Sequence, residues 1–337
     1  LLPLPGTVMT LFDGSFPFYP NTRTRFPFNT TLVLIISVFL TVLAMFILIL
    51  PGIRGKGRFF WLLRVVTSLF IGAVILSVNF TRDWEIGRVM ANTSYKSFSH
   101  AIVNAEIGLH IGLAGVNITL VGNPVNQISE TINYNEHFAW HLGADYTCIY
   151  AHSLAKGLPS PILYVAEKFS QHSPCGVHSQ YRISGHYTSV TLWLAFCTWL
   201  ISNMLFSMPI LLYGSYMILL TAALLICSLL FFSVARNSPM CTIRFGPASL
   251  QTVYGASFWL TLATGLLCFL LGLGMIVLNS VQPEKLKLVF NLSKEGREEE
   301  EEEGPVQRSL RDKASSSEQD MLLAPLSEHC KVMVTQL

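Results

Sequence analysis

Five long apolar runs constrain this chain more than any other feature. They are Leu32–Leu50, Phe59–Phe80, Val190–Met208, Ile210–Val234 and Phe258–Leu278. At ~1.5 Å of rise per residue, helices of this length approach the ~30 Å hydrocarbon thickness of a bilayer. A soluble helix has no reason to be apolar on every side over such a length. The composition agrees, with 51% hydrophobic and only 12% charged residues. The fold class predicted is therefore a membrane all-α bundle of five transmembrane helices.

The runs divide the chain into spans and connecting segments. We predict membrane spans at 32–50, 59–80, 188–208, 210–234 and 257–281. The other segments are an N-terminal arm at 1–31, a loop at 51–58, a polar block at 81–187, a loop at 235–256 and a tail at 282–337. The tail contains a run of six glutamates, which repel one another and favour disorder.

Lysine and arginine near the span ends predict the orientation. The loop at 51–58 contains three cations and the start of the tail contains four more, which places both on the cytoplasmic side. The N-terminus and the blocks at 81–187 and 235–256 are then outside, and the C-terminus is cytoplasmic. The N-terminal arm is rich in Phe, Pro and Tyr. These aromatic residues fit either interface anchors or an extended arm that lies on a partner.

The outer block contains two glycosylation sequons, Asn92-Thr93-Ser94 and Asn117-Ile118-Thr119. Because the acceptor Asn-X-Ser/Thr is modified on the lumenal side, we expect glycans at Asn92 and Asn117.

Three of the seven cysteines, Cys148, Cys175 and Cys241, fall on the predicted oxidising side. Cys175 shortly precedes the third span and Cys241 shortly follows the fourth. Since these two spans are joined by almost no turn, their outer ends should be neighbours. We therefore predict a Cys175–Cys241 disulfide, which leaves Cys148 free or available for an intermolecular bond.

The outer block has two kinds of pattern. Residues 105–121 alternate between apolar and polar around Ala114-Gly115, which predicts a β-hairpin with one buried face. From Ser129 to Lys156 the apolar residues recur at helical spacing, and Gly157 and Pro159 should end that helix. A helix packed on the hairpin would make a small α+β lobe outside the membrane.

Possible chemistry is limited to one histidine-rich stretch. On the predicted helix, His137, His141, Asp145, Cys148 and His152 would share one side. They could hold a divalent metal, or they could be the solvated face of an amphipathic helix, and the second interpretation is preferred. No phosphate loop, nucleophile elbow or metalloprotease motif is present. We therefore predict no catalytic residue, no cofactor, no metal site and no nucleic-acid partner; membrane lipid is the expected surrounding.

The spans also limit the function. Only Arg64 is ionisable within them, near the cytoplasmic end of the second span, where its side chain can reach the interface. Proton relays and ion-coupled carriers require buried charge, so a channel or carrier is the weakest alternative.

Several segments resemble the dual oxidase maturation factor family over residues 16–290. They include LPGIRGK at 50–56, FWLLRVVTSLFIGA at 60–73, ETINYNE at 130–136, SPCG at 173–176 and GHY at 185–187. The resemblance implies a five-span partner of a dual oxidase, a peroxide-producing NADPH oxidase, with a claudin-like outer lobe. It further implies heterodimerisation in the endoplasmic reticulum, escort of the oxidase to the plasma membrane and support of hydrogen peroxide production. Flavin, haem and NADPH would belong to the oxidase.

The chain departs from this pattern at a few positions. Ser129 replaces the asparagine of a further family sequon, and family members mostly carry an acidic residue at Cys148 and charged residues along the histidine stripe. These departures argue against the metal site. A claudin-like adhesion or barrier protein is the second alternative function, against which the fifth span counts.

Overall fold

The computed structural model describes residues 30–49, 57–96, 100–128, 130–140, 145–170, 173, 177–207, 211–236 and 242–281. The predictions for the N-terminal arm, for 51–56 and for the tail lie outside these residues. Contacts divide the chain into two units, Leu1–Ala44 with Val66–Val277 and Met45–Val65 with Leu278–Leu337. In the second unit, the rings of Phe46 and Trp61 meet edge-on with their centroids 5.8 Å apart.

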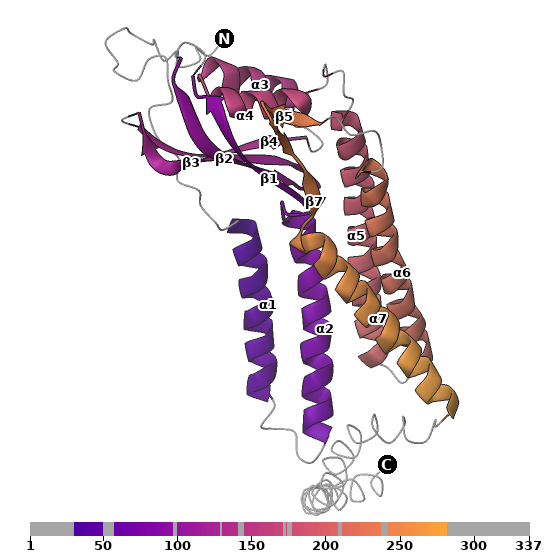
Figure 1. The fold of residues 1–337 in the computed structure, drawn as a ribbon. Helices are drawn as coiled ribbons and strands as arrows, with labels where there is room; N and C mark the ends of the chain where they lie inside the picture. Colours follow the sequence, from indigo (N-terminus) through magenta and orange to yellow (C-terminus); the bar gives the residue numbers. More distant parts are fainter. Residues whose placement is uncertain are drawn as a thin grey trace, which may run out of the picture. The chain divides into compact units, whose positions relative to one another are not determined.

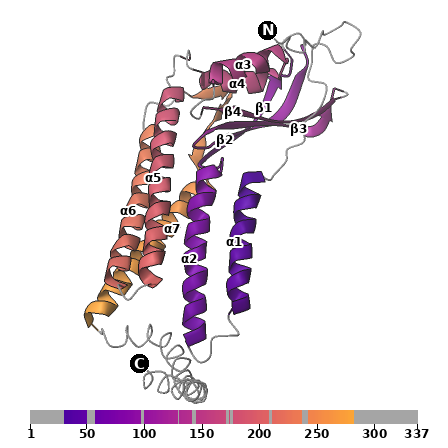
Figure 2. The same ribbon diagram turned by 180° about the vertical axis from the view of Figure 1, so that it is seen from behind.

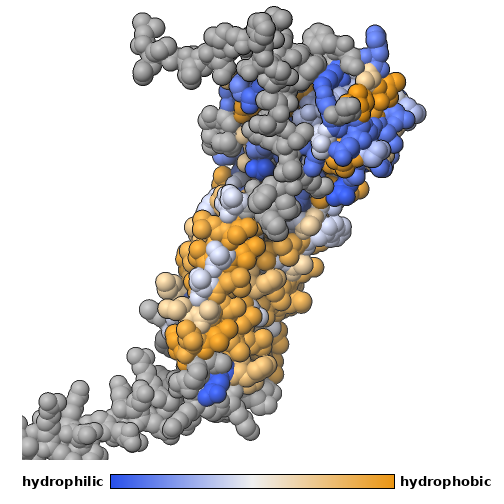
Figure 3. Space-filling view, turned by 90° about the vertical axis from the view of Figure 1, so that its left-hand side faces the viewer, coloured by the Kyte–Doolittle hydropathy of each residue, from blue (hydrophilic) through white to orange (hydrophobic). Residues whose placement is uncertain are grey.

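Five helices in the described parts of the chain are long and apolar enough to cross a membrane. They are α1 (Thr30–Ile49), α2 (Gly57–Phe80), α5 (Val177–Ser207), α6 (Leu211–Arg236) and α7 (Ala256–Val281). On the face seen in Figure 3, apolar side chains cover the long helices, and hydrophilic ones gather, with apolar patches among them, on the part that contains the sheet. The five predicted apolar helices are thus confirmed, and the protein is a multi-pass membrane protein.

Helices α5 and α6 lie side by side as an antiparallel pair (Figure 2). Hydroxyl groups join the two helices. The Ser184 hydroxyl donates to the Phe231 carbonyl at 2.6 Å, and the Thr198 and Thr221 hydroxyls lie 2.9 Å apart. Near the other end, the Ser202 hydroxyl donates to the Gly214 carbonyl at 3.1 Å. Lipid provides little hydrophobic drive for helices to associate, so close packing and such hydrogen bonds hold the pair together.

Helix α5 begins before the apolar run at 190–208. Its 31 residues span about 46 Å at 1.5 Å per residue, which exceeds the ~30 Å apolar thickness of a bilayer. The first turns of α5 therefore extend out of the bilayer, where they contact the sheet.

The lobe contains a five-stranded antiparallel sheet with the order β4-β3-β2-β1-β7 (Figure 1). Its strands are β1 (Glu85–Ser94), β2 (Ile102–Ile111), β3 (Gly115–Gln127), β4 (Glu130–Ala139) and β7 (Thr252–Tyr254). A separate hairpin pairs β5 (Ile243–Phe245) with β6 (Ala248–Leu250). The predicted hairpin is confirmed, because β2 and β3 pair with Ile107 opposite Leu120 and Ile111 opposite Val116.

One face of the sheet, the inner face, carries the core of the lobe. Ile107, Leu109 and Ile118 are buried on it, and helices α3 (Tyr146–Ala155) and α4 (Ser160–Lys168) lie over it (Figure 1). The Tyr146 hydroxyl donates to the Ala166 carbonyl at 2.6 Å, which joins α3 to α4. Burial raises the pKa of this hydroxyl, so it stays a donor at physiological pH.

The single helix predicted over 129–156 is wrong. Residues 130–139 form strand β4, and among the described residues of this stretch only Tyr146–Ala155 is helical. Phe138 is buried on the inner face opposite Val116 rather than on a helical stripe. The predicted end of the helix is confirmed, since Gly157 follows α3 with a φ of 70°, a conformation that glycine adopts without strain.

Candidate interaction surfaces

The corner between α2 and β1 joins the lobe to the helices. Trp84 is fully buried there, and its indole N–H donates to the Val78 carbonyl, near the end of α2, at 2.8 Å. Its ring packs on Phe232 of α6, with centroids 5.1 Å apart. The last carbonyls of a helix have no hydrogen-bond donor within the helix. The indole of Trp84 is a donor for one of them.

Glu85, the next residue, is also fully buried and accepts a hydrogen bond from the Tyr181 hydroxyl at 2.7 Å. Tyr181 lies on the part of α5 that precedes the apolar run. A buried carboxylate is costly unless it is hydrogen-bonded, so the pair fixes where α5 meets β1.

Glycines allow two close backbone approaches at this junction. A Cβ atom on Gly185 of α5 would overlap the Leu113 carbonyl oxygen, and one on Gly255 would overlap the Asp83 carbonyl oxygen. The Gly255 N–H also donates to the Trp84 carbonyl at 2.8 Å. Helix α5 and the residue before α7 therefore both lie close to the backbone of the segments that adjoin β1, β2 and β3.

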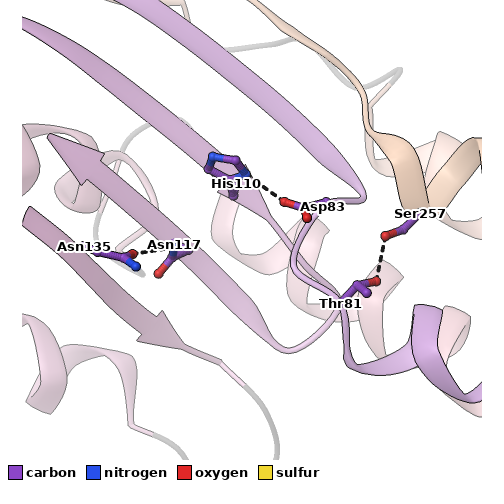
Figure 4. A network of polar contacts seen from close by, with 6 residues as sticks. All are labelled: Thr81, Asp83, His110, Asn117, Asn135 and Ser257. Atoms are coloured by element: carbon purple, nitrogen blue, oxygen red, sulfur yellow. Dashed lines mark hydrogen bonds and ion pairs between the residues drawn. The ribbon is translucent and has the colours of Figure 1, made fainter. Parts of the chain in front are cut away.

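The opposite face of the sheet, the outer face, carries a set of polar contacts (Figure 4). Asn117 on β3 donates its amide to the Asn135 side-chain oxygen on β4 at 2.6 Å. On β2, His110 Nδ1 lies 2.7 Å from Asp83 Oδ1, which connects the sheet to the end of α2. The Thr81 and Ser257 hydroxyls, 2.7 Å apart, add a link to α7. These contacts hold the sheet in place but do not form a nucleophile-and-base arrangement.

Both predicted glycan sites lie on strands. Asn92 is exposed near the end of β1, whereas Asn117 is half-buried in the middle of β3. The two predicted disulfide partners, Cys175 and Cys241, lie outside the described residues.

The structure does not place the histidine stripe on one helix. His137 is on β4, and Asp145 caps α3, where it accepts hydrogen bonds from the Thr147 hydroxyl at 2.6 Å and the Thr147 N–H at 3.0 Å. These bonds hold the pKa of the Asp145 carboxyl below its usual value. Cys148 and His152 are exposed on α3, and His141 is outside the described residues. Within the part of the chain that the structure describes, no group of three His, Cys, Asp or Glu side chains could hold a metal.

Sequence reasoning did not identify the junction residues. Asp83-Trp84-Glu85 begins three residues after the second apolar run ends, and two acids beside a tryptophan at a membrane edge were the available signal. Their partners, His110 and Tyr181, are 27 and 96 residues away along the chain.

Known proteins resemble this chain over most of its length. A family model described as dual oxidase maturation factor matches residues 18–294. Dual oxidase maturation factor 1 from Mus musculus is 53% identical over 330 residues, covering 96% of each chain. The Homo sapiens protein of the same name is 57% identical over 287 residues, covering 85% of this chain and 83% of that one. Dual oxidase maturation factor 2 from Mus musculus is 52% identical over 285 residues, covering 85% and 89%.

Proposed function

The chain belongs to the dual oxidase maturation factor family, and we propose that it is a non-catalytic membrane partner of a dual oxidase. In this role it binds the oxidase in the endoplasmic reticulum membrane, enables its maturation and exit, and supports hydrogen peroxide production at the plasma membrane. The observation that carries the proposal is the extent of the family match, which covers the spans, the lobe and the junction between them.

Complementary burial is the physical basis of this role. A membrane protein with uncovered surface is retained until a partner covers it, and this chain offers both lipid-facing helices and a folded lobe. Throughout α1 no described residue is buried, and in the other four helices no more than a third of the apolar span is buried within the chain. The N-terminus, the claudin-like lobe and the loop at 235–256 would face the cell exterior, and the tail the cytoplasm.

Co-expression tests this function. Cells that contain a dual oxidase and this chain should show more oxidase at the surface, more processed oxidase glycans and severalfold more released peroxide than cells with the oxidase alone. Surface biotinylation and a peroxide assay measure these quantities. Unchanged surface oxidase with well-expressed chain would contradict the proposal.

We also propose the Cys175–Cys241 disulfide. Mass spectrometry of unreduced peptides should find the two cysteines linked, and Cys175→Ser or Cys241→Ser should each lower the free energy of unfolding by about 2–4 kcal/mol. Cys268→Ser, at a buried cysteine within α7, controls for the loss of a cysteine that is free in the structure. Alkylation of both Cys175 and Cys241 without reductant would contradict the bridge.

A further inference from the structure

Both glycan sequons of the lobe lie on one face of the sheet. Asn92 is directly opposite Asn104, and His110 is directly opposite Asn117. Residues opposite each other in an antiparallel pair share a face, and so do residues an even number apart along one strand. Asn104 and His110 are six apart on β2, so Asn92 and Asn117 project from the same side. That side is the outer face, away from the buried Ile107 and Ile118.

Glycans at these positions are compatible with the observed contacts. Asn92 is exposed, and the half-buried Asn117 uses one amide hydrogen for its bond to Asn135. A glycosylated asparagine keeps one amide hydrogen, so that bond can remain. Two glycans on one side of a five-stranded sheet would obstruct a protein approaching from that side.

The opposite side of the lobe presents an unusual helix. Between Tyr146 and Ala155, α3 contains no Asp, Glu, Lys or Arg. Its exposed residues are Cys148, Ala151, His152, Leu154 and Ala155. The Leu154 side chain is 56% exposed although leucine gains from burial. A surface helix ordinarily has charged residues on its outer face, whereas the centre of a protein interface is depleted in charge.

We propose that this α3 face is where the extracellular part of the dual oxidase docks on the lobe, and that the outer sheet face is the glycan-bearing side turned away from it. The inference rests on the proposed function and specifies its contact surface.

The size of the face favours this occupant over a second copy of the chain. A ten-residue helix is about 15 Å long, so one side of it offers a few hundred Å² at most. A stable interface buries about 800 Å² on each partner, so α3 alone would not hold two copies together. A partner that is also held through the membrane helices needs less area at each contact, because the second contact is then intramolecular.

Engineered glycans test the assignment. Ala151→Asn makes the sequon Asn-His-Ser with the existing Ser153, and Glu106→Thr makes Asn-Ala-Thr at Asn104 on the outer face. Each variant should gain one enzymatically removable glycan. We expect Ala151→Asn to lower co-purification of the dual oxidase by about tenfold or more, because a glycan cannot fit within a packed contact, and Glu106→Thr to change it less than about twofold.

Two further variants separate contact from folding. The double variant Ala151→Asn with Ser153→Ala keeps the new asparagine but lacks the sequon, so it should co-purify as the parent does. Leu154→Glu places a charge on the α3 face without a glycan. It tests whether this face contacts the oxidase even if residue 151 is not glycosylated. It should weaken co-purification severalfold while leaving the melting temperature near that of the parent, since Leu154 is exposed.

Three results would overturn the inference. In the first, the glycosylated Ala151→Asn variant binds the oxidase as well as the parent. In the second, Glu106→Thr abolishes binding and Ala151→Asn does not, which would place the oxidase contact on the outer face. In the third, two differently tagged copies of this chain co-purify without oxidase and Ala151→Asn separates them, which assigns α3 to a second copy. Failure of the unmodified parent to bind any dual oxidase would instead refute the proposed function.

Discussion

Replacement of Gly255 by alanine should leave little folded protein. Gly255 precedes α7, and an added Cβ would overlap the Asp83 carbonyl oxygen, while Ile86 closes the same space. The atom it meets is backbone at the base of β1, so no side chain can rotate away. Overpacking usually costs about 1–3 kcal/mol, and we expect the free energy of unfolding to fall by about 3 kcal/mol or more here. Thermal unfolding in detergent and the monodisperse yield measure this effect.

Local consequences should accompany this loss. To make room, Gly255 must move away from β1 and give up its 2.8 Å hydrogen bond to the Trp84 carbonyl. Strand β7 ends one residue earlier and pairs with β1 through Glu85 opposite Tyr254, so that pairing should weaken. Gly274→Ala is the matched control, because a Cβ there meets no atom within 4 Å. Equal melting temperatures for the two variants would show that Gly255 and the Asp83 carbonyl do not pack closely enough to exclude a Cβ atom.

The apolar helices were predictable because a bilayer imposes length and composition on every span. The β2–β3 hairpin was predictable for a similar reason, since the buried residues Ile107, Leu109 and Ile111 alternate strictly with residues of the outer face. In both cases one physical requirement acts on each residue of the segment, so the pattern is continuous.

Strand β4 was not predictable in this way. Its inner-face residues are Ile132, Tyr134, Glu136 and Phe138, and the charged Glu136 interrupts the alternation. Phe138 and the following Leu142 and Tyr146 then repeat every four residues and imitate a helix. This segment becomes a strand because it pairs with the free edge of β3. The residue pattern within 130–139 does not show that such an edge is nearby.

The junction was out of reach for a different reason. Strand β7 has three residues and joins β1 from a loop that follows α6, and Tyr181 reaches Glu85 only because α5 extends beyond its apolar run. Each contact joins segments distant in sequence. A tyrosine and a glutamate occur in many environments, so the residue types of Tyr181 and Glu85 do not predict that the two side chains meet.

Trp84→Ala should be the most destabilising truncation of a side chain at this junction. It removes a fully buried indole and its hydrogen bond to the Val78 carbonyl. Phe/Trp→Ala changes in a core usually cost about 3–5 kcal/mol, and the lost hydrogen bond adds to the loss here, although the Thr81 hydroxyl still donates to the Val78 carbonyl at 3.0 Å. Trp84→Phe should cost less, because it keeps most of the ring that packs on Phe232. Melting temperatures in one detergent compare the variants.

Trp259→Ala is the control that shows whether the destabilisation by Trp84→Ala comes from the burial of Trp84 or from the removal of any tryptophan. Trp259 is in the first turn of α7 with 58% of its surface exposed, so its removal leaves no cavity. Its melting temperature should stay near that of the parent while that of Trp84→Ala falls by many degrees. If the two variants lost equal stability, the indole at position 84 would not be what binds α2, β1 and α6 together. In that case the position of the lobe would depend on the remaining junction contacts, among them the Glu85–Tyr181 pair, the His110–Asp83 contact and the glycine approaches.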